Sequence, residues 1–89
     1  MFSGIIEGMA RVEAIRTEQD NVHFPLSCPF VEELKIDQSV AHNGVCLTVV
    51  AIDGDRYTVT AMKETLDRSN LGELKGGDRV NVERSMLMN

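Results

Sequence analysis

Short runs in which apolar and polar residues alternate are the feature of this sequence that most constrains its fold. Successive side chains of a strand point to opposite faces, so such alternation places one face in a core and the other in solvent. Turn residues separate the runs about every 8–12 positions, a spacing typical of all-β domains. The six runs are residues 6–15, 22–27, 39–42, 45–52, 56–61 and 79–83. The sequence therefore predicts an all-β fold, a six-stranded antiparallel barrel with one or two short helices.

The first two runs carry the clearest marks of barrel geometry. One face of the first run is small and apolar, being formed by Ile6, Gly8, Ala10, Val12 and Ala14. Small side chains permit the strong curvature of a narrow barrel, and we expect one continuous strand here. In the second run we expect Pro25, like the following Pro29, to mark an edge or an end, because proline has no N–H for a central ladder.

The strands that follow are joined by strong turn signals. Asn43-Gly44 and Asp53-Gly54 flank the run 45–52 and predict tight hairpins on both sides of it. This run is apolar on both faces, so we expect the core on one side and a partner or a ligand on the other. The chain 30–34 predicts a single helical turn, and 63–71 predicts a short helix that ends at Gly72.

Composition limits the classes of function. The chain has 89 residues, which suits one domain, and nine Lys and Arg against fourteen Asp and Glu give a net charge of −5. The basic residues are scattered singly, which argues against nucleic-acid binding. No apolar run approaches the ~20 residues of a membrane span, and the N-terminus lacks the basic region of a signal peptide. Cys28 and Cys46 fit neither zinc nor disulfide spacing. We therefore expect a cytoplasmic protein with free thiols, no metal site and no membrane association.

Two segments combine polar groups with apolar strand residues. In residues 39–49, hydroxyls, an amide and a thiol interrupt an apolar stretch, and a planar polar heterocycle would satisfy such groups. In residues 60–65 a strand passes into a helix, where backbone groups become free to bind a ring edge. Ordinary turn and capping chemistry would explain both segments equally well. His23 and His42 stand alone in the sequence, and we interpret such residues as hydrogen-bonded structural histidines.

Four motifs in a fixed order make the sequence resemble riboflavin synthase. They are Met1 to Gly8, Ser39 to Val49 (SVAHNGVCLTV), Met62 to Leu66 with Asn70-Leu71-Gly72, and Gly77 to Arg84 (GDRVNVER). The resemblance implies a Greek-key barrel of six strands that forms the N-terminal half of a two-barrel enzyme, with the second barrel absent. It also implies that the full enzyme is a homotrimer in which each barrel holds one 6,7-dimethyl-8-ribityllumazine, one molecule donating a four-carbon unit to the other. No cofactor or metal is implied, and riboflavin or its lumazine precursor is the bound ligand.

The resemblance also implies which residues form the site. The ring would be held by Gly4, Ile5, Ile6, Cys46, Leu47, Thr48, Thr60, Ala61, Met62, Lys63, Glu64 and Thr65. Ser39 and Cys46 would lie near the reacting ring and transfer a proton or orient a nucleophile. His42 and Phe2 are further candidates. Many members of the family have a second cysteine where this chain has Val45, which bears on the catalytic role of Cys46.

Three functions stay open at this point. The first is the ligand-binding barrel of riboflavin synthase, inactive or nearly so as an isolated domain and paired as a homodimer that imitates the two barrels. The second is a non-catalytic lumazine-binding or flavin-binding module like the lumazine proteins of luminous bacteria. The third is a small structural barrel with no ligand.

Overall fold

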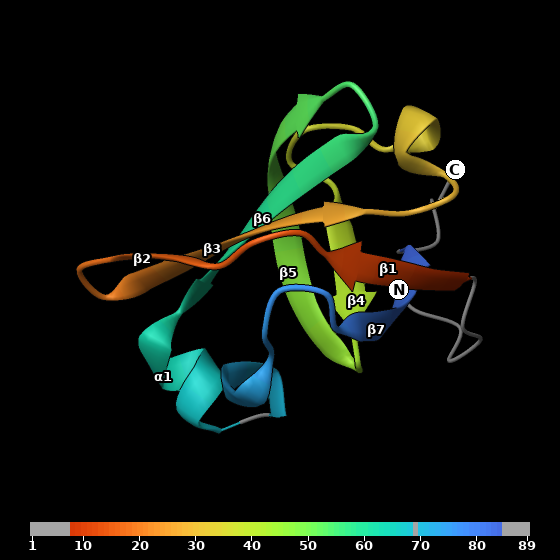
Figure 1. Ribbon diagram of the computed structural model, residues 1–89. Coiled ribbons are helices and arrows are strands. Elements are labelled where there is room, and N and C mark those ends of the chain that lie inside the picture. Colours follow the sequence, from red (N-terminus) through yellow and green to blue (C-terminus); the bar gives the residue numbers. More distant parts are fainter. Residues whose placement is uncertain (1–7, 69, 85–89) are drawn as a thin grey trace.

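A closed antiparallel barrel forms the body of the protein in the computed structural model, which describes residues 8–68 and 70–84 (Figure 1). The strands are β1 (Gly8–Val12), β2 (Arg16–Glu18), β3 (Asn21–Ser27), β4 (Ser39–His42), β5 (Val45–Asp53), β6 (Arg56–Met62) and β7 (Arg79–Arg84). They are hydrogen-bonded in the order β1-β7-β4-β5-β6-β3-β2, and additional pairing of β1 with β3 closes the ring. Since β2 only prolongs the sheet beyond this closure, six strands form the barrel, as the alternation predicted.

The connections give the barrel its Greek-key topology. β4, β5 and β6 follow one another as a meander, and β3 lies beside β6 rather than beside β4. Both hairpins of the meander are tight, as predicted. Asn43 and Gly44 have φ of 50° and 85°, the two positive values that a type I′ turn needs. In the next hairpin Gly54 has φ of 64°, and the two-residue loop consists of Gly54 and Asp55.

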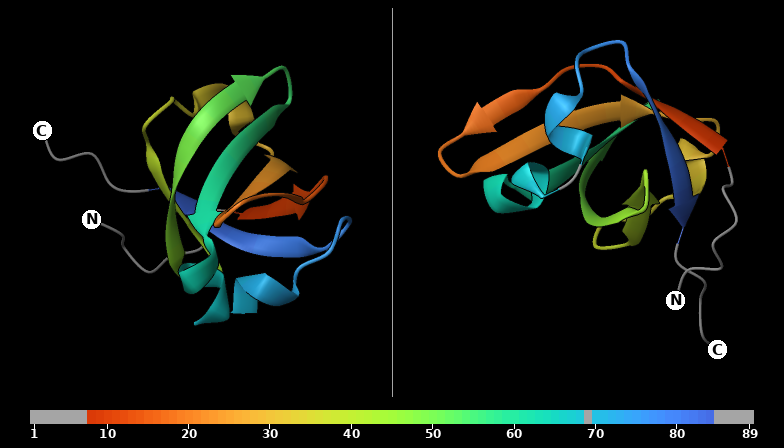
Figure 2. Two further views of the ribbon diagram at one scale, coloured as in Figure 1. Left: turned by 90° about the vertical axis from the view of Figure 1, so that its left-hand side faces the viewer. Right: turned by 90° about the horizontal axis from the view of Figure 1, so that it is seen from below.

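Aliphatic side chains from all six barrel strands fill the interior. The fully buried ones follow the predicted alternation, with Val12, Val40, Val49, Val59 and Val82 each 0% exposed. Two short segments close the ends of the barrel (Figures 1 and 2). The 3-10 turn η1 (Val31–Glu33) forms where a helical turn was predicted, and Val31 and Leu34 are buried there. The other segment comprises α1 (Lys63–Asp67) and η2 (Asn70–Glu73) and buries Leu66 and Leu71.

The first run is not one continuous strand, contrary to expectation. It breaks at residues 13–15, between β1 and β2. β3 pairs with both pieces: its end, Leu26 and Ser27, lies beside β1, and its start, Asn21 to His23, lies beside β2. β1 belongs to the barrel wall, whereas β2 forms a hairpin with the start of β3. This hairpin projects from the barrel in Figures 1 and 2. The pairing of β3 with the two pieces differs in register by one residue, so the break acts as a β-bulge that bends the first run.

Pro25 lies in the middle of β3, paired with Thr58 of β6, and not at an edge or an end as predicted. The main-chain groups of one strand residue point the same way, and the Pro25 carbonyl accepts the Glu13 N–H at 2.8 Å. The side on which proline lacks its N–H thus faces the break between β1 and β2. No hydrogen bond between β3 and β6 is lost as a result.

The helix after β6 is shorter than predicted. α1 spans Lys63–Asp67, and Gly72 lies within a separate 3-10 segment, η2 (Asn70–Glu73). A Cβ atom added to Gly72 would lie 2.9 Å from the Leu66 carbonyl oxygen, so η2 folds back closely against the end of α1. None of the helices in the described residues is long and apolar enough to cross a membrane.

Candidate functional site

A row of polar side chains crosses four neighbouring strands on the outer face of the barrel. Ser39 of β4 pairs with Thr48 of β5, Thr48 pairs with Thr60 of β6, and Thr60 pairs with His23 of β3. We call these four residues the outer polar row. Three of them are half-buried and Thr48 is exposed. Directly paired residues share a face of the sheet, so the strand register alone brings these side chains together. His23 and Thr60, for example, lie 37 positions apart in the sequence.

Strand alternation decides which predicted site residues reach this face with their side chains. Cys46 and Thr48 are exposed, whereas Leu47 between them is buried at 6% exposure. On β6 the side chain of Met62 is 60% exposed, and Ala61 is buried at 2%. Leu47 and Ala61 therefore offer only main-chain groups to a ligand on the outer face.

The end of the row borders the junction between β6 and α1. The Lys63 N–H donates to the Asp20 carbonyl at 2.8 Å, which ties the junction to the β2–β3 hairpin. Lys63 and Glu64 are exposed, and Thr65 is half-buried. Glu64 forms an exposed ion pair with Arg68, four residues along the chain, at 3.0 Å between Oε1 and Nη2. Pairs of this kind contribute only a few tenths of a kcal/mol, about 0.3–0.5.

His23 and Thr60 share the shortest polar contact in the row. The Nδ1 atom of His23 lies 2.7 Å from Oγ1 of Thr60. On the other side of the ring, Nε2 lies 3.5 Å from Oε1 of Glu18. The sequence alone did not reveal this chain of three residues, because only the register of β3 with β6 and β2 creates it.

His42 lies inside the barrel, on the opposite side of β4 from Ser39. It is 2% exposed; its Nδ1 lies 3.0 Å from the Val40 carbonyl oxygen and its Nε2 lies 2.9 Å from the Tyr57 hydroxyl oxygen. A carbonyl only accepts, so Nδ1 carries the proton and Nε2 accepts from the Tyr57 hydroxyl. Burial lowers the pKa of His42 to about 4, although the bond to Val40 partly opposes this. The same burial raises the pKa of Tyr57.

The remaining predicted site residues divide into two groups. Phe2, Gly4, Ile5 and Ile6 lie outside the described residues. Both cysteines are free thiols, Cys46 exposed and Cys28 half-buried, and burial raises the pKa of Cys28. Within residues 8–68 and 70–84, no three His, Cys, Asp or Glu side chains are grouped so that they could hold a metal ion.

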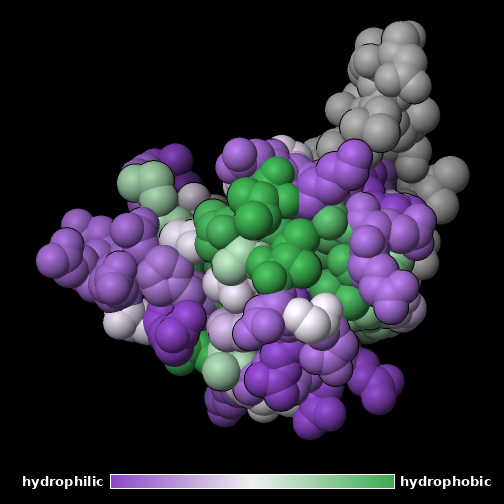
Figure 3. Space-filling view, turned by 90° about the horizontal axis from the view of Figure 1, so that it is seen from above, coloured by the Kyte–Doolittle hydropathy of each residue, from purple (hydrophilic) through white to green (hydrophobic). Residues whose placement is uncertain are grey.

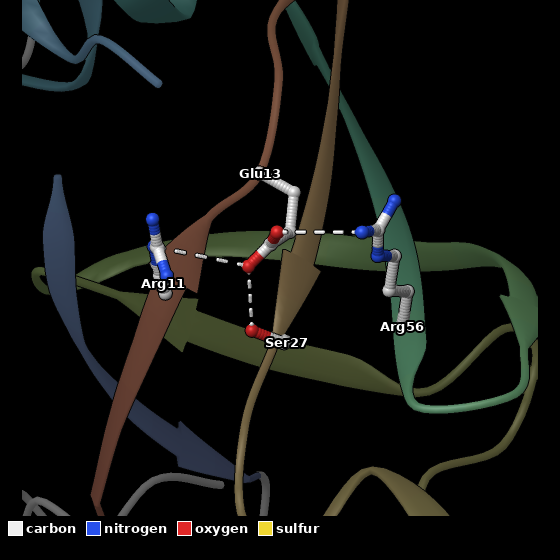
Figure 4. A network of polar contacts seen from close by, with 4 residues as sticks. All are labelled: Arg11, Glu13, Ser27 and Arg56. Atoms are coloured by element: carbon white, nitrogen blue, oxygen red, sulfur yellow. Dashed lines mark hydrogen bonds and ion pairs between the residues drawn. The ribbon is translucent and has the colours of Figure 1, made fainter. Parts of the chain in front are cut away.

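A second polar cluster, which the sequence gave no sign of, joins three strand ends (Figure 4). Ser27 donates to Oε2 of Glu13 at 2.9 Å, Arg56 lies 3.5 Å from Oε1, and Arg11 lies 4.0 Å from Oε2. Glu13 occupies the break after β1 and is 19% exposed, so this cluster fastens the break to β3 and β6. A surface hollow of about 380 Å3 lies beside it, lined by Met9, Ala10, Arg11, Ser27, Cys28, Pro29, Asp55 and Arg79.

The fold and the outer polar row together define a small Greek-key barrel with hydrogen-bonding side chains presented on its outer wall. The chain belongs to the lumazine binding domain family, whose model matches residues 3–85. The resemblance to riboflavin synthase is confirmed by similarity to the riboflavin synthases of Escherichia coli K12 and Bacillus subtilis 168. The first is 44% identical over 96% of this chain and 41% of the relative, and the second is 34% identical over 100% and 42%. The chain thus spans about two-fifths of the length of these relatives.

Solved structures of LumP are similar to this barrel. LumP complexed with 6,7-dimethyl-8-(1'-D-ribityl) lumazine superposes with a TM-score of 0.87 at 28% identity, covering 96% of this chain and 49% of the other. LumP complexed with riboflavin gives a TM-score of 0.87 at 26% identity, covering 100% and 51%. The barrel predicted from the sequence is therefore a fold known to occur in proteins with bound lumazine and flavin.

Proposed function

We propose that this chain is the N-terminal barrel of a riboflavin synthase and that its outer polar row binds 6,7-dimethyl-8-ribityllumazine and riboflavin. The register of Ser39, Thr48 and Thr60 carries the proposal, because it places three hydroxyls from the two predicted segments, residues 39–49 and 60–65, on one face. A ring with several nitrogen and oxygen atoms at its edge would find partners in these side chains and in the main chain of residues 46–48 and 60–65. Gly4, Ile5 and Ile6 complete the proposed set.

Ser39 and Cys46 are the proposed catalytic residues. Both project from the hairpin β4–β5 on its outer side, Ser39 opposite Thr48 and Cys46 opposite Ala41. A hydroxyl and a thiol in this position would transfer a proton at the ring or orient a nucleophile toward its C7 carbon. His42 points into the core, so we assign it a structural role in this site instead of a catalytic one.

The reaction would need two barrels. One lumazine donates a four-carbon unit to the other, which gives riboflavin and a pyrimidinedione, without a cofactor or a metal. One barrel would hold one lumazine, so the isolated chain is expected to bind ligand and to produce little or no riboflavin. In a protein with the length of the relatives, the second barrel would supply the missing half of each site, and the enzyme would be a homotrimer.

For the 89-residue chain we propose a homodimer that places two outer walls face to face. Exposed apolar side chains support an interface of this kind: Val50 on β5 is 46% exposed and Ile36, in the loop bonded to β5, is 58% exposed. Figure 3, which looks onto the end of the barrel with the β5–β6 hairpin and η1, shows apolar side chains gathered between polar ones. Sedimentation with saturating riboflavin is expected to give a dimer, and a monomer at high micromolar concentration would contradict it.

Two measurements test the proposed function. Riboflavin fluorescence should be quenched saturably, with one ligand per chain, and absence of saturable binding would leave only the structural barrel. Incubation of the lumazine with the longer protein that contains this barrel should yield riboflavin. Lack of product would favour the second candidate, a binding module like LumP. The structural similarity supports this candidate, whereas the outward-facing side chains of Ser39 and Cys46 argue against it. We propose a cytoplasmic location, since both cysteines are free thiols.

A further inference from the structure

The hydroxyl of Thr60 has a partner within the barrel before any ligand arrives. Its oxygen lies 2.7 Å from Nδ1 of His23, across the β3–β6 pair in which the two residues stand directly opposite each other. The side chain of His23 is 24% exposed, and it belongs to no motif that resembles riboflavin synthase.

Glu18 decides which atom of the neutral His23 ring carries the proton. Its carboxylate oxygen lies 3.5 Å from Nε2, and an ionised carboxylate only accepts hydrogen bonds. The neutral ring therefore keeps its proton on Nε2, facing Glu18. Nδ1 is left as an acceptor, and at 2.7 Å it accepts a hydrogen bond from the Thr60 hydroxyl. The oxygen of Thr60 then has only lone pairs to offer on the outer face.

We propose that His23, oriented by Glu18, is a positioning and specificity residue that makes Thr60 a hydrogen-bond acceptor for a hydroxyl of the ligand's ribityl chain. The inference rests on the proposed function and deepens it. Flavin and lumazine rings present mostly acceptors at their edges, whereas a ribityl chain carries several hydroxyl donors. A hydroxyl held as an acceptor therefore selects the polyol chain over the ring edge, and His23 makes this selection without contacting the ligand itself.

The test compares riboflavin with lumiflavin, which has the same ring and a methyl group in place of the ribityl chain. Fluorescence titration of the 89-residue chain should show tighter binding of riboflavin. His23→Leu removes the acceptor and is expected to weaken riboflavin binding about three- to tenfold, the value of one net hydrogen bond, with lumiflavin binding unchanged. His23→Asn restores an acceptor in the place of Nδ1 and should recover most of the preference. Glu18→Ala should lower the preference in the same direction.

Thr58→Val is the matched control. Thr58 is also half-buried on β6, two residues from Thr60, but it pairs with Pro25. This variant should keep the ratio of the two dissociation constants. If His23→Leu weakens the binding of both flavins by the same factor, His23 only stabilises the barrel. If the affinities for both flavins stay unchanged, His23 plays no part in selection. Either result overturns the inference while the proposed function stands. If the unaltered chain binds neither flavin, both fail.

Discussion

The Nε2 atom of His42 lies 2.9 Å from the hydroxyl oxygen of Tyr57, and both side chains are enclosed by the barrel. The two rings are tilted by 38°, with their centroids 5.8 Å apart. Each supplies what the other needs, since Tyr57 donates and Nε2 accepts. This single contact joins β4 to β6 through the interior and bears directly on the stability of the fold.

Tyr57→Phe should destabilise the barrel. The substitution leaves the Nε2 lone pair of His42 buried without a donor, which costs about 1–3 kcal/mol of unfolding free energy. The adjoining interior cavity has only about 10 Å3, too little to admit a bridging water readily. Urea denaturation measures the effect. Combining Tyr57→Phe with His42→Leu should cost less than the sum of the two single changes, and full additivity would show that the bond contributes nothing.

Stability should fall as the solution becomes acidic, because of His42. Burial lowers its folded pKa to about 4 from the ordinary histidine value of 6.5, so the unfolded chain binds the proton more readily. The stability contribution is fully present above about pH 6.5 and is lost progressively as the pH falls toward 4. Between pH 7 and pH 5 the loss from this group is about 2 kcal/mol.

Urea denaturation at a series of pH values checks this prediction. His42→Gln removes the titrating group and should flatten the curve between pH 7 and pH 5 relative to the unaltered protein. Val59→Ala is a suitable control, since it destabilises the same core without removing a titrating group. Parallel curves for His42→Gln and the unaltered protein would show that His42 does not control the acid sensitivity.

Thr48→Lys should weaken ligand binding strongly without unfolding the barrel. Thr48 is exposed in the centre of the outer polar row, so a lysine there would occupy the space proposed for the ring. We expect riboflavin affinity to fall at least about tenfold, a loss of about 1.4 kcal/mol, and stability to change by less than about 0.5 kcal/mol. Thr17→Lys adds the same charge at an exposed position on β2 and should bind normally. Unchanged affinity in Thr48→Lys would move the site elsewhere.

Gly72→Ala should destabilise the contact between α1 and η2. The added methyl group would lie 2.9 Å from the Leu66 carbonyl oxygen, a backbone atom that has little room to move. A cost of about 1–3 kcal/mol is expected, as for other overpacked sites. At Gly76 the same methyl group would meet the Glu13 carbonyl oxygen at an ordinary 3.7 Å. Thermal unfolding of Gly76→Ala should therefore differ little from that of the unaltered protein, and equal melting temperatures for both variants would contradict the argument.

Much of the barrel is encoded locally in the chain. A period of two identifies which residues of a strand share a face, and Val59, Val80 and Val82, on the apolar faces of their runs, are all buried. Turn residues carry their own conformational preference, so both hairpins of the meander lie at the predicted positions. The motif resemblance identified the family because it depends only on the order and spacing of residues along the chain.

Pairing between distant segments supplied the rest. The break at residues 13–15 and the interior position of Pro25 depend on strand pairing, since β3 pairs with two pieces of the first run whose registers differ by one residue. The outer polar row exists only because β3, β5 and β6 align in one register, and the contact of His23 with Thr60 is a consequence of it. Local alternation determines which face of a strand a side chain occupies. Its neighbours on that face depend on which strands pair beside it, and this pairing is set by the fold of the whole chain.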